Sequence, residues 1–481
     1  KKEKDEVDED DPIANIYFQR VPYKRSEEEL NDETSDFNKG MRALETILET
    51  APETLEHEDA SSGGEEGEGK DLESSGVVLS TSAPKLRKSL SAEESKERVS
   101  SLPKVEGQTQ DFVTTKKMYF YRTPQIQSRM AKKFMLFAAP SSEDLAGDVA
   151  HLLGLDLNRV EVGNFTDGET KIEVKESVRG KYVFVVCTTS SNDAVMELML
   201  MIATLRNASA KHITAVIPYY GYSRQDRKIK REPIAAADIA LMLEEMGVDR
   251  VMCMDIHNDS LRGFFPPTIP VEHLMPVPVA AAYFHEELSV GSPPPDWKPK
   301  NKDDVYYPPV TIVASHEGQV HRAAHFRSVL QRLSGQDIEL AFISKSRQKI
   351  GEIFYTPRLV GKVEGRRCIL VDDIVNTGST LRTNVKKLHE LGAANIYAWT
   401  THGVFPPDDS KSDVPAMIQG MEYLDYLLIS NSVMNQQRFS SKIRQLNVAP
   451  LLAEAMARAL HDQSISGILN LDDTKVERYD G

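Results

Sequence analysis

From residue 134 to residue 403 the chain alternates short apolar, β-rich runs with longer stretches of helical periodicity. "KFMLFAA" is followed by "SEDLAGDVAHLLG", "YVFVVCT" by "DAVMELMLMIATLRNA", and "HITAVIP" by "IAAADIALMLEEMG". Later "VTIVAS" is followed by "HRAAHFRSVLQRLSG", and "RRCILVDDIV" by "LRTNVKKLHELGA". Such alternation is typical of βαβ units, in which helices cover a parallel sheet. The sequence therefore predicts an α/β fold with two similar domains, each a mainly parallel sheet flanked by helices.

One stretch rich in proline and charge, "SVGSPPPDWKPKNKDDVYYPP", interrupts the alternation at residues 289–309. Such a composition favours a surface insertion or a linker. We therefore expect a first α/β domain at residues 132–275 and a second at 276–433, with the insertion inside the second. Residues 434–465 are expected to form a C-terminal segment whose helix, "APLLAEAMARALH", packs on the first domain, and residues 466–481 a tail.

Residues 1–115 differ in composition from the rest of the chain. They include the low-complexity stretch "SSGGEEGEGKDLESSG", and residues 1–100 carry a net charge of −13 out of −15 for the whole chain. So little apolar material cannot offset the entropy of ordering, which predicts a disordered acidic tail. Within it, "FNKGMRALETILET" has apolar residues at helical spacing, and we interpret it either as a docking helix or as a frayed helix without a partner.

The remaining chain has 46 acidic and 44 basic residues, so it is close to neutral. A dominant nucleic-acid surface would need a basic face, and we exclude that class of partner. No apolar run approaches the roughly 18 residues of a membrane span, so we expect no membrane partner. Cys187, Cys253 and Cys368 lie in apolar, strand-like runs, typical of buried reduced thiols. Together these features predict a cytoplasmic protein.

The segment "ILVDDIVNTGSTLRT", residues 369–383, places Asp372 and Asp373 at the end of a predicted strand. Ligands of open α/β sheets bind at the carboxyl ends of strands. The carboxylates suit sugar hydroxyls or a divalent cation. Backbone N–H groups at the start of the following helix lack helical partners and suit a phosphate; they belong to Thr377, Gly378, Ser379 and Thr380. Together these groups describe ribose 5-phosphate, whereas the alternative is a capped helix with two solvated acids.

This loop closely resembles the ribose-phosphate loop of type I phosphoribosyltransferases and of ribose-phosphate pyrophosphokinases. Three further segments resemble the pyrophosphokinases. The first, "GNFTDGETKIEVKESVRGKYVFVV", is similar to the segment that supplies adenine contacts to a neighbouring subunit. The second, "IPYYGYSRQDRK", resembles the ATP loop, and the third, "VMCMDIHNDSLRGFF", ends a strand with a histidine that in the family approaches ATP phosphates and magnesium. The resemblance implies these ATP-binding residues: Phe165, Asp167, Glu169, Arg224, Gln225, Asp226 and His257.

A fourth segment, "AFISKSR", carries Lys345 and Arg347 in the place of the family's catalytic loop. Two cations there would stabilise charge that develops on the transferred group. Read without the resemblance, they are an ordinary basic pair after a strand. Likewise "DGET" is then a turn, "SRQDRK" a solvated basic loop and His257 a structural histidine.

The resemblance covers residues 132–465 and implies two phosphoribosyltransferase-type domains. It implies a ribose-phosphate diphosphokinase that transfers pyrophosphate from ATP to ribose 5-phosphate with Mg²⁺, to which His257 would be a ligand. The products are 5-phosphoribosyl 1-pyrophosphate and AMP, for nucleotide biosynthesis. It also implies dimers that assemble into a hexamer, or a hetero-oligomer with paralogues. The implied ribose 5-phosphate residues are Asp372, Asp373, Asn376, Thr377, Gly378, Ser379 and Thr380.

Two positions depart from the family pattern. The family usually reads "SPDAGG" after the first strand of its second domain, whereas this chain reads "ASHEGQVHR", with His316 in the place of aspartate. Asn376 also replaces an aspartate. Magnesium prefers oxygen ligands, so a histidine is a poor substitute for the aspartate. A second hypothesis therefore stays open, in which the chain is a catalytically weak regulatory or scaffold subunit of a hetero-oligomeric synthetase. A third is a phosphoribosyltransferase that consumes the same product.

Overall fold

The computed structural model describes residues 132–228, 230–289, 298, 306, 308–348, 354–406, 413–434, 439 and 441–470, and three two-residue strands outside these ranges. Of residues 345–348, 354–357 and 469–470 it describes the backbone alone. The chain divides into two units, residues 1–104 and 105–481, and every described residue belongs to the second. The candidate docking helix "FNKGMRALETILET" lies outside the described residues, as does most of the insertion at 289–309.

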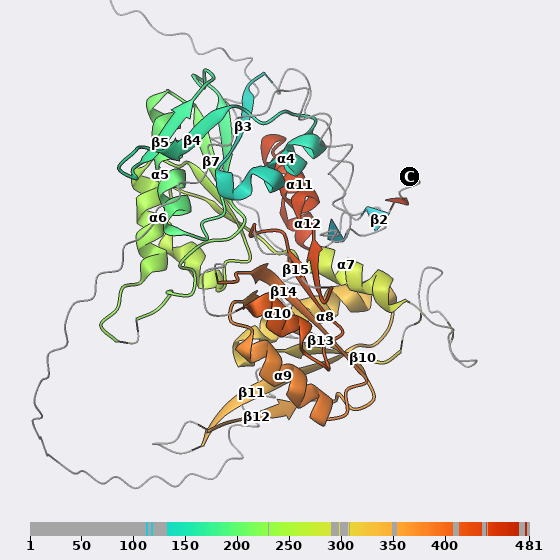
Figure 1. The fold of residues 1–481 in the computed structure, drawn as a ribbon. Coiled ribbons are helices and arrows are strands. Elements are labelled where there is room, and N and C mark those ends of the chain that lie inside the picture. The colour runs from blue at the N-terminus through green and yellow to red at the C-terminus, as the bar shows by residue number, and fades with distance from the viewer. Residues whose placement is uncertain are drawn as a thin grey trace, which may run out of the picture. The chain divides into compact units, whose positions relative to one another are not determined.

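The first sheet has five parallel strands in the order β3-β6-β7-β8-β9 (Figure 1). Four of its strands, β3, β6, β7 and β8, are mostly apolar because both faces of the sheet are buried, as in other parallel sheets, whereas the edge strand β9 is half polar. Leu136 and Phe184 pack on the face that α4 covers, whereas Phe137 and Val185 pack on the face of α5 and α6. The elements are β3 (Phe134–Ala138), α4 (Glu143–Leu153), β6 (Tyr182–Val186), α5 (Asn192–Asn207), β7 (His212–Ile217), α6 (Ala235–Glu245), β8 (Arg250–Met254) and β9 (Val271–Leu274).

The second sheet has eight strands in the order β1-β16-β15-β14-β13-β10-β11-β12 (Figure 1), and only β12 runs antiparallel to its neighbour. Its strands are β1 (Phe112–Val113), β10 (Val310–Ala314), β11 (Glu339–Gln348), β12 (Phe354–Val360), β13 (Arg367–Val375), β14 (Asn395–Gly403), β15 (Tyr426–Ser430) and β16 (Ile443–Leu446). The helices around it are α7 (Val277–Leu288), α8 (Val320–Ser334), α9 (Ser379–Glu390), α10 (Val414–Gln419) and α11 (Ala449–Leu460). The predicted fold class, α/β with two mainly parallel sheets, is confirmed.

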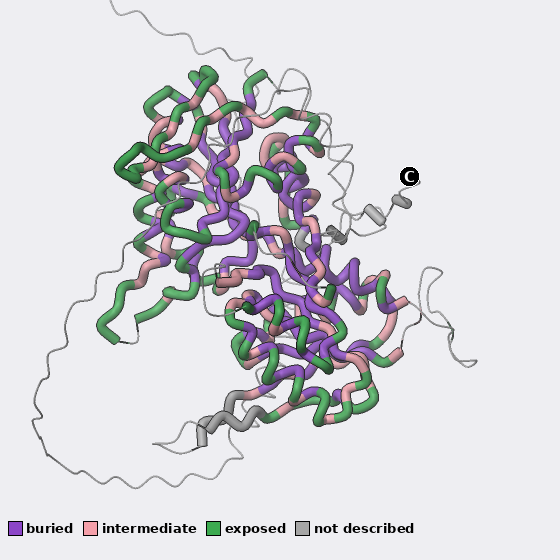
Figure 2. The backbone as a smooth tube through the Cα atoms, in the orientation of Figure 1, coloured by how far each residue is buried: buried purple, intermediate pink, exposed green. Residues whose placement is uncertain are grey.

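One hydrophobic cluster runs through both α/β domains, and the strands inside it are buried along their length (Figure 2). It joins residues of β3 and α4 to residues of α7, α8, β13 and α11. At its edge the Asn447 side-chain amide donates to Asp148 at 2.9 Å. The two sheets therefore share a core, and α11 packs directly on α4 of the first domain.

The structure adds secondary structure inside three of the predicted segments. Strand β16 lies within residues 434–465 but extends the second sheet, because its backbone pairs in parallel with β15. Strand β1 lies within the range predicted to be disordered, and it pairs with β16. The range 466–481, predicted to be a tail, contains α12 (Ser466–Asn470) and β17 (Glu477–Arg478), and β17 pairs with β2 (Lys117–Met118). The three cysteines, by contrast, are buried free thiols as predicted.

A pH-dependent contribution to stability is expected from Glu197 on α5. Burial, with the charge of Asp193, raises the pKa of Glu197 to about 7. A carboxyl group whose folded pKa exceeds its unfolded pKa is neutral in the native state at low pH, and it destabilises that state progressively as pH rises from its ordinary pKa to the raised one. We therefore expect Glu197→Gln to raise the melting temperature at pH 8 and to leave it unchanged at pH 4. An equal effect at both pH values in a thermal melt would contradict this.

Candidate active site

The carboxyl ends of β8 and β13 meet through side chains that follow or end these strands. His257 Nδ1, after β8, is hydrogen-bonded to Asp373 Oδ2, at the end of β13. Asp255 and His257 both have left-handed backbones, with φ of 43° and 65°. A non-glycine residue in that region costs about 1–3 kcal/mol and is found most often at functional sites. The strain at β8 therefore marks this junction as the candidate site.

Asp373 is buried and held at both carboxylate oxygens. In addition to the bond with His257, its Oδ1 accepts from Gln319 Nε2 at 2.9 Å. Burial raises the pKa of Asp373, but the hydrogen bond with His257 and the charge of Arg322 outweigh it and hold that pKa well below its usual range. The same hydrogen bond raises the pKa of His257 above its ordinary value. The two groups thus shift each other's pKa in opposite directions.

Behind this pair lies a buried ion pair between Asp255 and Arg322, a residue of α8. Arg322 Nε donates to both carboxylate oxygens at 3.2 and 3.1 Å. Burial raises the pKa of Asp255, yet Arg322 lowers it overall. Thr401 donates a further hydrogen bond to this carboxylate, and His402 Nε2 lies 3.2 Å from the Asp255 carbonyl. The buried Asp255 carboxylate, just after β8, thus binds Arg322 of α8 and Thr401 of β14.

The predicted phosphate loop lies between β13 and α9. Gly378 lies just before the helix with φ of 67°, a left-handed backbone that favours glycine. Thr377 and Ser379 are exposed, and their hydroxyls lie 3.1 Å apart. Asn376 instead donates from its side chain to the Val404 carbonyl at 2.7 Å, which ties the loop to the chain after β14. Backbone N–H groups at the start of a helix have no partner within that helix, so the start of α9 suits an anion.

Asp372 differs from its neighbour in both exposure and charge. It is half-buried, and its Oδ1 accepts from the Asp373 backbone N–H at 3.0 Å. Burial and the adjacent Asp373 raise the pKa of Asp372. Asp372 is therefore the more exposed carboxyl group of the pair.

The residues predicted to bind ATP lie in two places. Phe165, Asp167 and Glu169 lie in the turn between β4 (Val160–Asn164) and β5 (Thr170–Val174), and the Phe165 ring is 52% exposed. Among the described residues, no hydrogen bond or ion pair joins this turn to His257 or Asp373. An exposed aromatic ring at a hairpin tip suits a contact with a second molecule, which is the role implied by the resemblance.

The loop after β7 does reach the junction. Asp226 accepts a hydrogen bond from the Asn258 side chain at 3.1 Å, next to His257. Arg224 and Gln225 are exposed in the same loop. Gly221 is required at its start, because a side chain there would collide with the Thr189 carbonyl. The loop is therefore fixed at its base and presents its charged side chains to solvent.

We predicted that Lys345 and Arg347 follow a strand. In the structure, the backbone of both residues lies within one. Strand β11 continues to Gln348, and β12 pairs with it antiparallel, so that Lys345 lies opposite Pro357 and Arg347 opposite Tyr355. Proline is tolerated in β12 because this is the edge strand of the sheet. Both side chains lie outside the described part of the structure.

Comparisons with known proteins agree with this architecture. Residues 134–247 match the family model of the N-terminal domain of ribose phosphate pyrophosphokinase, and residues 352–470 match that of the phosphoribosyl synthetase-associated domain. The chain is 36% identical over 343 residues to the ribose-phosphate pyrophosphokinase of Clostridium perfringens, which covers 70% of this chain and 98% of that protein. The chain belongs to the ribose-phosphate pyrophosphokinase family.

Two other members of the family give similar values. Ribose-phosphate pyrophosphokinase 1 of Streptococcus pneumoniae is 35% identical over 344 residues, covering 70% of this chain and 97% of that protein. The crystal structure of phosphoribosylpyrophosphate synthetase from Mycobacterium smegmatis superimposes with a TM-score of 0.58 at 31% identity, over 69% of this chain and 99% of that one. The shared region thus spans nearly the full length of the relatives.

Within this family framework, His316 has a local structural role. Its ring Nδ1 accepts from the Gly318 backbone N–H at 3.1 Å and so caps the short helix η4 (Glu317–Gln319) that leads into α8. Among the described residues, no three side chains of His, Cys, Asp or Glu converge as a metal site. Magnesium is usually held by one or two carboxylates together with substrate phosphates, and Asp372 with Asp373 fits that arrangement. His257 already uses Nδ1 for Asp373, so only its Nε2 remains for a metal.

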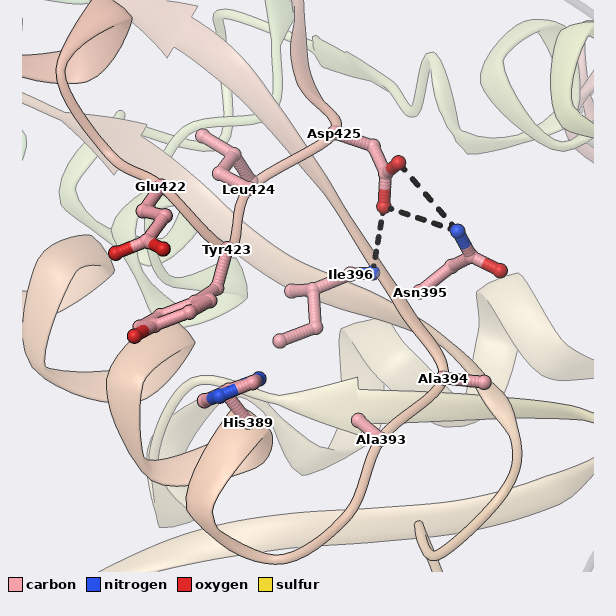
Figure 3. Close-up of a pocket in the computed structure, with 9 residues that line it drawn as sticks. All are labelled: His389, Ala393, Ala394, Asn395, Ile396, Glu422, Tyr423, Leu424 and Asp425. Atoms are coloured by element: carbon pink, nitrogen blue, oxygen red, sulfur yellow. Dashed lines mark hydrogen bonds between the residues drawn. The ribbon is translucent and has the colours of Figure 1, made fainter.

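A cavity of about 270 Å³ lies at the amino ends of β14 and β15, the edge opposite to Asp372 (Figure 3). His389 and Tyr423 stack on one another at its mouth, and Asp425 accepts from the Ile396 backbone N–H at 2.9 Å. It contains none of the predicted site residues.

No helix in the described ranges is both long and apolar enough to cross a membrane.

Sequence reasoning missed Gln319, Arg322 and the ionic role of Asp255. One signal was available, since Arg322 lies at helical spacing with the buried Phe326 and Val329, on the apolar face of α8. A charged residue on such a face requires a partner, because an unpaired buried charge is expensive. The identity of that partner depends on tertiary contacts across 67 residues of chain, which no local pattern reveals.

Proposed function

We propose that this chain is a ribose-phosphate diphosphokinase. In the presence of magnesium it transfers the β,γ-pyrophosphoryl group of ATP to the 1-hydroxyl of ribose 5-phosphate, giving 5-phosphoribosyl 1-pyrophosphate and AMP for nucleotide biosynthesis. The observation that carries the proposal is the junction of His257 with Asp373, because it brings the ATP side of the first domain against the ribose side of the second. We propose further that the enzyme is cytoplasmic and works as a homo-oligomer, from dimer to hexamer, or with paralogues.

Ribose 5-phosphate binds at the start of α9. Its phosphate accepts from the backbone N–H groups of Thr377 to Thr380, where the helix dipole favours negative charge. Asp372 accepts from ribose hydroxyls, and Asp373, fixed by His257, holds the adjacent edge of the sugar. Asn376 contributes by keeping the loop attached to Val404. This orientation leaves the 1-hydroxyl facing the first domain.

ATP binds across the first domain. Arg224 and Gln225 bind its phosphates, Asp226 orients this loop through Asn258, and His257 lies beside the β-phosphate. Phe165, Asp167 and Glu169 take the adenine of a neighbouring subunit. Magnesium, when bound, neutralises phosphate charge, and Lys345 and Arg347 stabilise charge on the transferred group. The 1-oxygen forms the new bond to the β-phosphorus, and the bond from that phosphorus to the α,β-bridging oxygen breaks to release AMP.

A second candidate function is a regulatory or scaffold subunit with little activity of its own. The observation that favours it is the use of His316 as a helix cap and of Asn376 as a loop tie, both at positions where the family has aspartate. A subunit of this kind would bind active relatives through the same fold. It would not release AMP when assayed alone.

The test is an assay of AMP release by the purified chain with ATP, ribose 5-phosphate and magnesium. We expect turnover that is lost when magnesium is chelated and restored when it is added back. Release only after addition of an active paralogue would instead support the regulatory subunit. Activity with a nucleobase and 5-phosphoribosyl 1-pyrophosphate, without AMP release from ATP, would identify a phosphoribosyltransferase.

A further inference from the structure

The start of α8 carries two buried polar side chains that form one continuous chain of hydrogen bonds. Gln319 is 2% exposed and Arg322 is 8% exposed. The Gln319 amide uses both ends, since its Nε2 donates to Asp373 and its Oε1 accepts from Arg322. Arg322 in turn donates to Asp255. The chain of contacts therefore runs from the end of β8, through α8, to the end of β13.

The same two strands are joined a second time by His257 and Asp373. Because Asp255 and His257 are separated by one residue, the two connections form a closed ring of contacts that passes through Asp373. One of its carboxylate oxygens is fixed by Gln319, at the end of η4 just before α8, and the other by His257, after β8. Its backbone N–H also donates to Asp372 at 3.0 Å, so the position of Asp372 depends on this ring.

The chemistry of the ring selects an amide at residue 319. A glutamate there would still accept from Arg322, but it would place a second carboxylate against Asp373, and like charges repel at this distance. A methionine would fill a similar volume but leave both Asp373 Oδ1 and Arg322 without this partner. Glutamine alone among these three supplies a donor on one side and an acceptor on the other.

We propose that Gln319 and Arg322 are positioning residues that hold Asp373, and through it Asp372, in the orientation that binds ribose. This inference rests on the proposed function of the site. It assigns the amide–guanidinium pair to the ribose side of the reaction, since Gln319 donates to Asp373 and Arg322 donates to Gln319. The ATP phosphates are assigned to Arg224 and Gln225 on the loop after β7 and to His257, which contacts the other oxygen of Asp373. Loss of the pair therefore weakens ribose 5-phosphate more than ATP.

The test compares Gln319→Glu and Gln319→Met with the wild-type full chain. Gln331→Glu is the matched control, because Gln331 lies on the same helix and also donates to an aspartate, Asp337, at 3.2 Å, but on the exposed surface. The affinity for ribose 5-phosphate and for a non-hydrolysable ATP analogue is measured by calorimetry. Thermal melts establish that each variant is folded.

We expect both variants at residue 319 to weaken ribose 5-phosphate binding about 10- to 100-fold, since a misplacement of about 1 Å in a binding group costs up to about 100-fold. The affinity of both variants for the ATP analogue is expected to match the wild type. In the same variants the KM for ribose 5-phosphate should rise while the KM for ATP stays unchanged. Gln331→Glu should match the wild type in every measurement. Equal weakening of both substrates, or folded variants that bind ribose 5-phosphate like the wild type, would overturn the inference alone. A wild-type chain that does not bind ribose 5-phosphate would overturn the proposed function and, with it, this inference.

Discussion

An Arg322→Ala variant is expected to lose about 3–5 kcal/mol of unfolding free energy, because removal of one partner leaves the other as an uncompensated buried charge. Asp255 is 1% exposed and has no water to solvate it once the guanidinium is gone. Gln319 also loses the donor to its Oε1. Urea denaturation followed by circular dichroism measures the change as a lower midpoint with an unchanged slope.

Two comparisons isolate the cause of that loss. Lys175→Ala removes a cation paired with Glu161 and Glu173 at 3.0 and 2.7 Å on the surface, and it should change the urea midpoint far less, because exposed ion pairs contribute little to stability. A double variant, Arg322→Leu with Asp255→Asn, should recover much of the loss, since no buried charge then remains. If Arg322→Ala were no more destabilising than Lys175→Ala, the ion pair would not be a buried one in solution.

A Lys345→Ala variant is expected to reduce the rate of pyrophosphoryl transfer about 100-fold or more while ATP binding changes little. The reason is that a positive group aimed at developing charge acts mainly in the transition state, where removal of one such donor costs about 100- to 1,000-fold. The backbone of Lys345 lies in the β11–β12 hairpin, which fixes its position along the strand. Single-turnover formation of AMP measures the chemical step, and calorimetry with ATP measures binding.

Lys362→Ala serves as the control for this experiment, because Lys362 is exposed just after β12 and its charge lies outside the proposed site. It should leave both the single-turnover rate and ATP affinity unchanged. A Lys345→Ala enzyme with the wild-type single-turnover rate would refute the catalytic role of this residue. A rate loss that matched the loss of ATP affinity would mean that Lys345 binds ATP in the ground state.

Much of the fold was predictable because periodicity reports burial directly. The strand from Cys368 to Val371 and the helix face of Leu381, Val385 and Leu388 follow from apolar spacing alone, and all of these residues are buried. Strands β15 and β16 were missed for a physical reason. A short apolar run does not distinguish strand from helix, and "IRQL" is half polar, so their pairing in the second sheet decides their structure.

The candidate site was predictable to the level of its local loops. The order strand, acids, small residues, helix is a local pattern, and the structure has it between β13 and α9. What the pattern lacked was the surroundings of Asp373. Its two carboxylate oxygens contact His257, 116 residues away in sequence, and Gln319, 54 residues away. The first contact exists only after the two sheets have packed together, and the second only after β10 has paired with β13 in the second sheet.

The apolar cluster that runs through both sheets also limits how this protein moves. Two domains with separate cores commonly rotate about a linker to open and close a cleft, but here such a rotation would break up the cluster that joins residues of β3 and α4 to residues of α7, α8, β13 and α11. The cheaper motions are those of loops at the carboxyl edges, such as the loop after β7. Substrate entry is therefore a matter of loop rearrangement on a stationary body, and heat should melt both domains in a single cooperative transition.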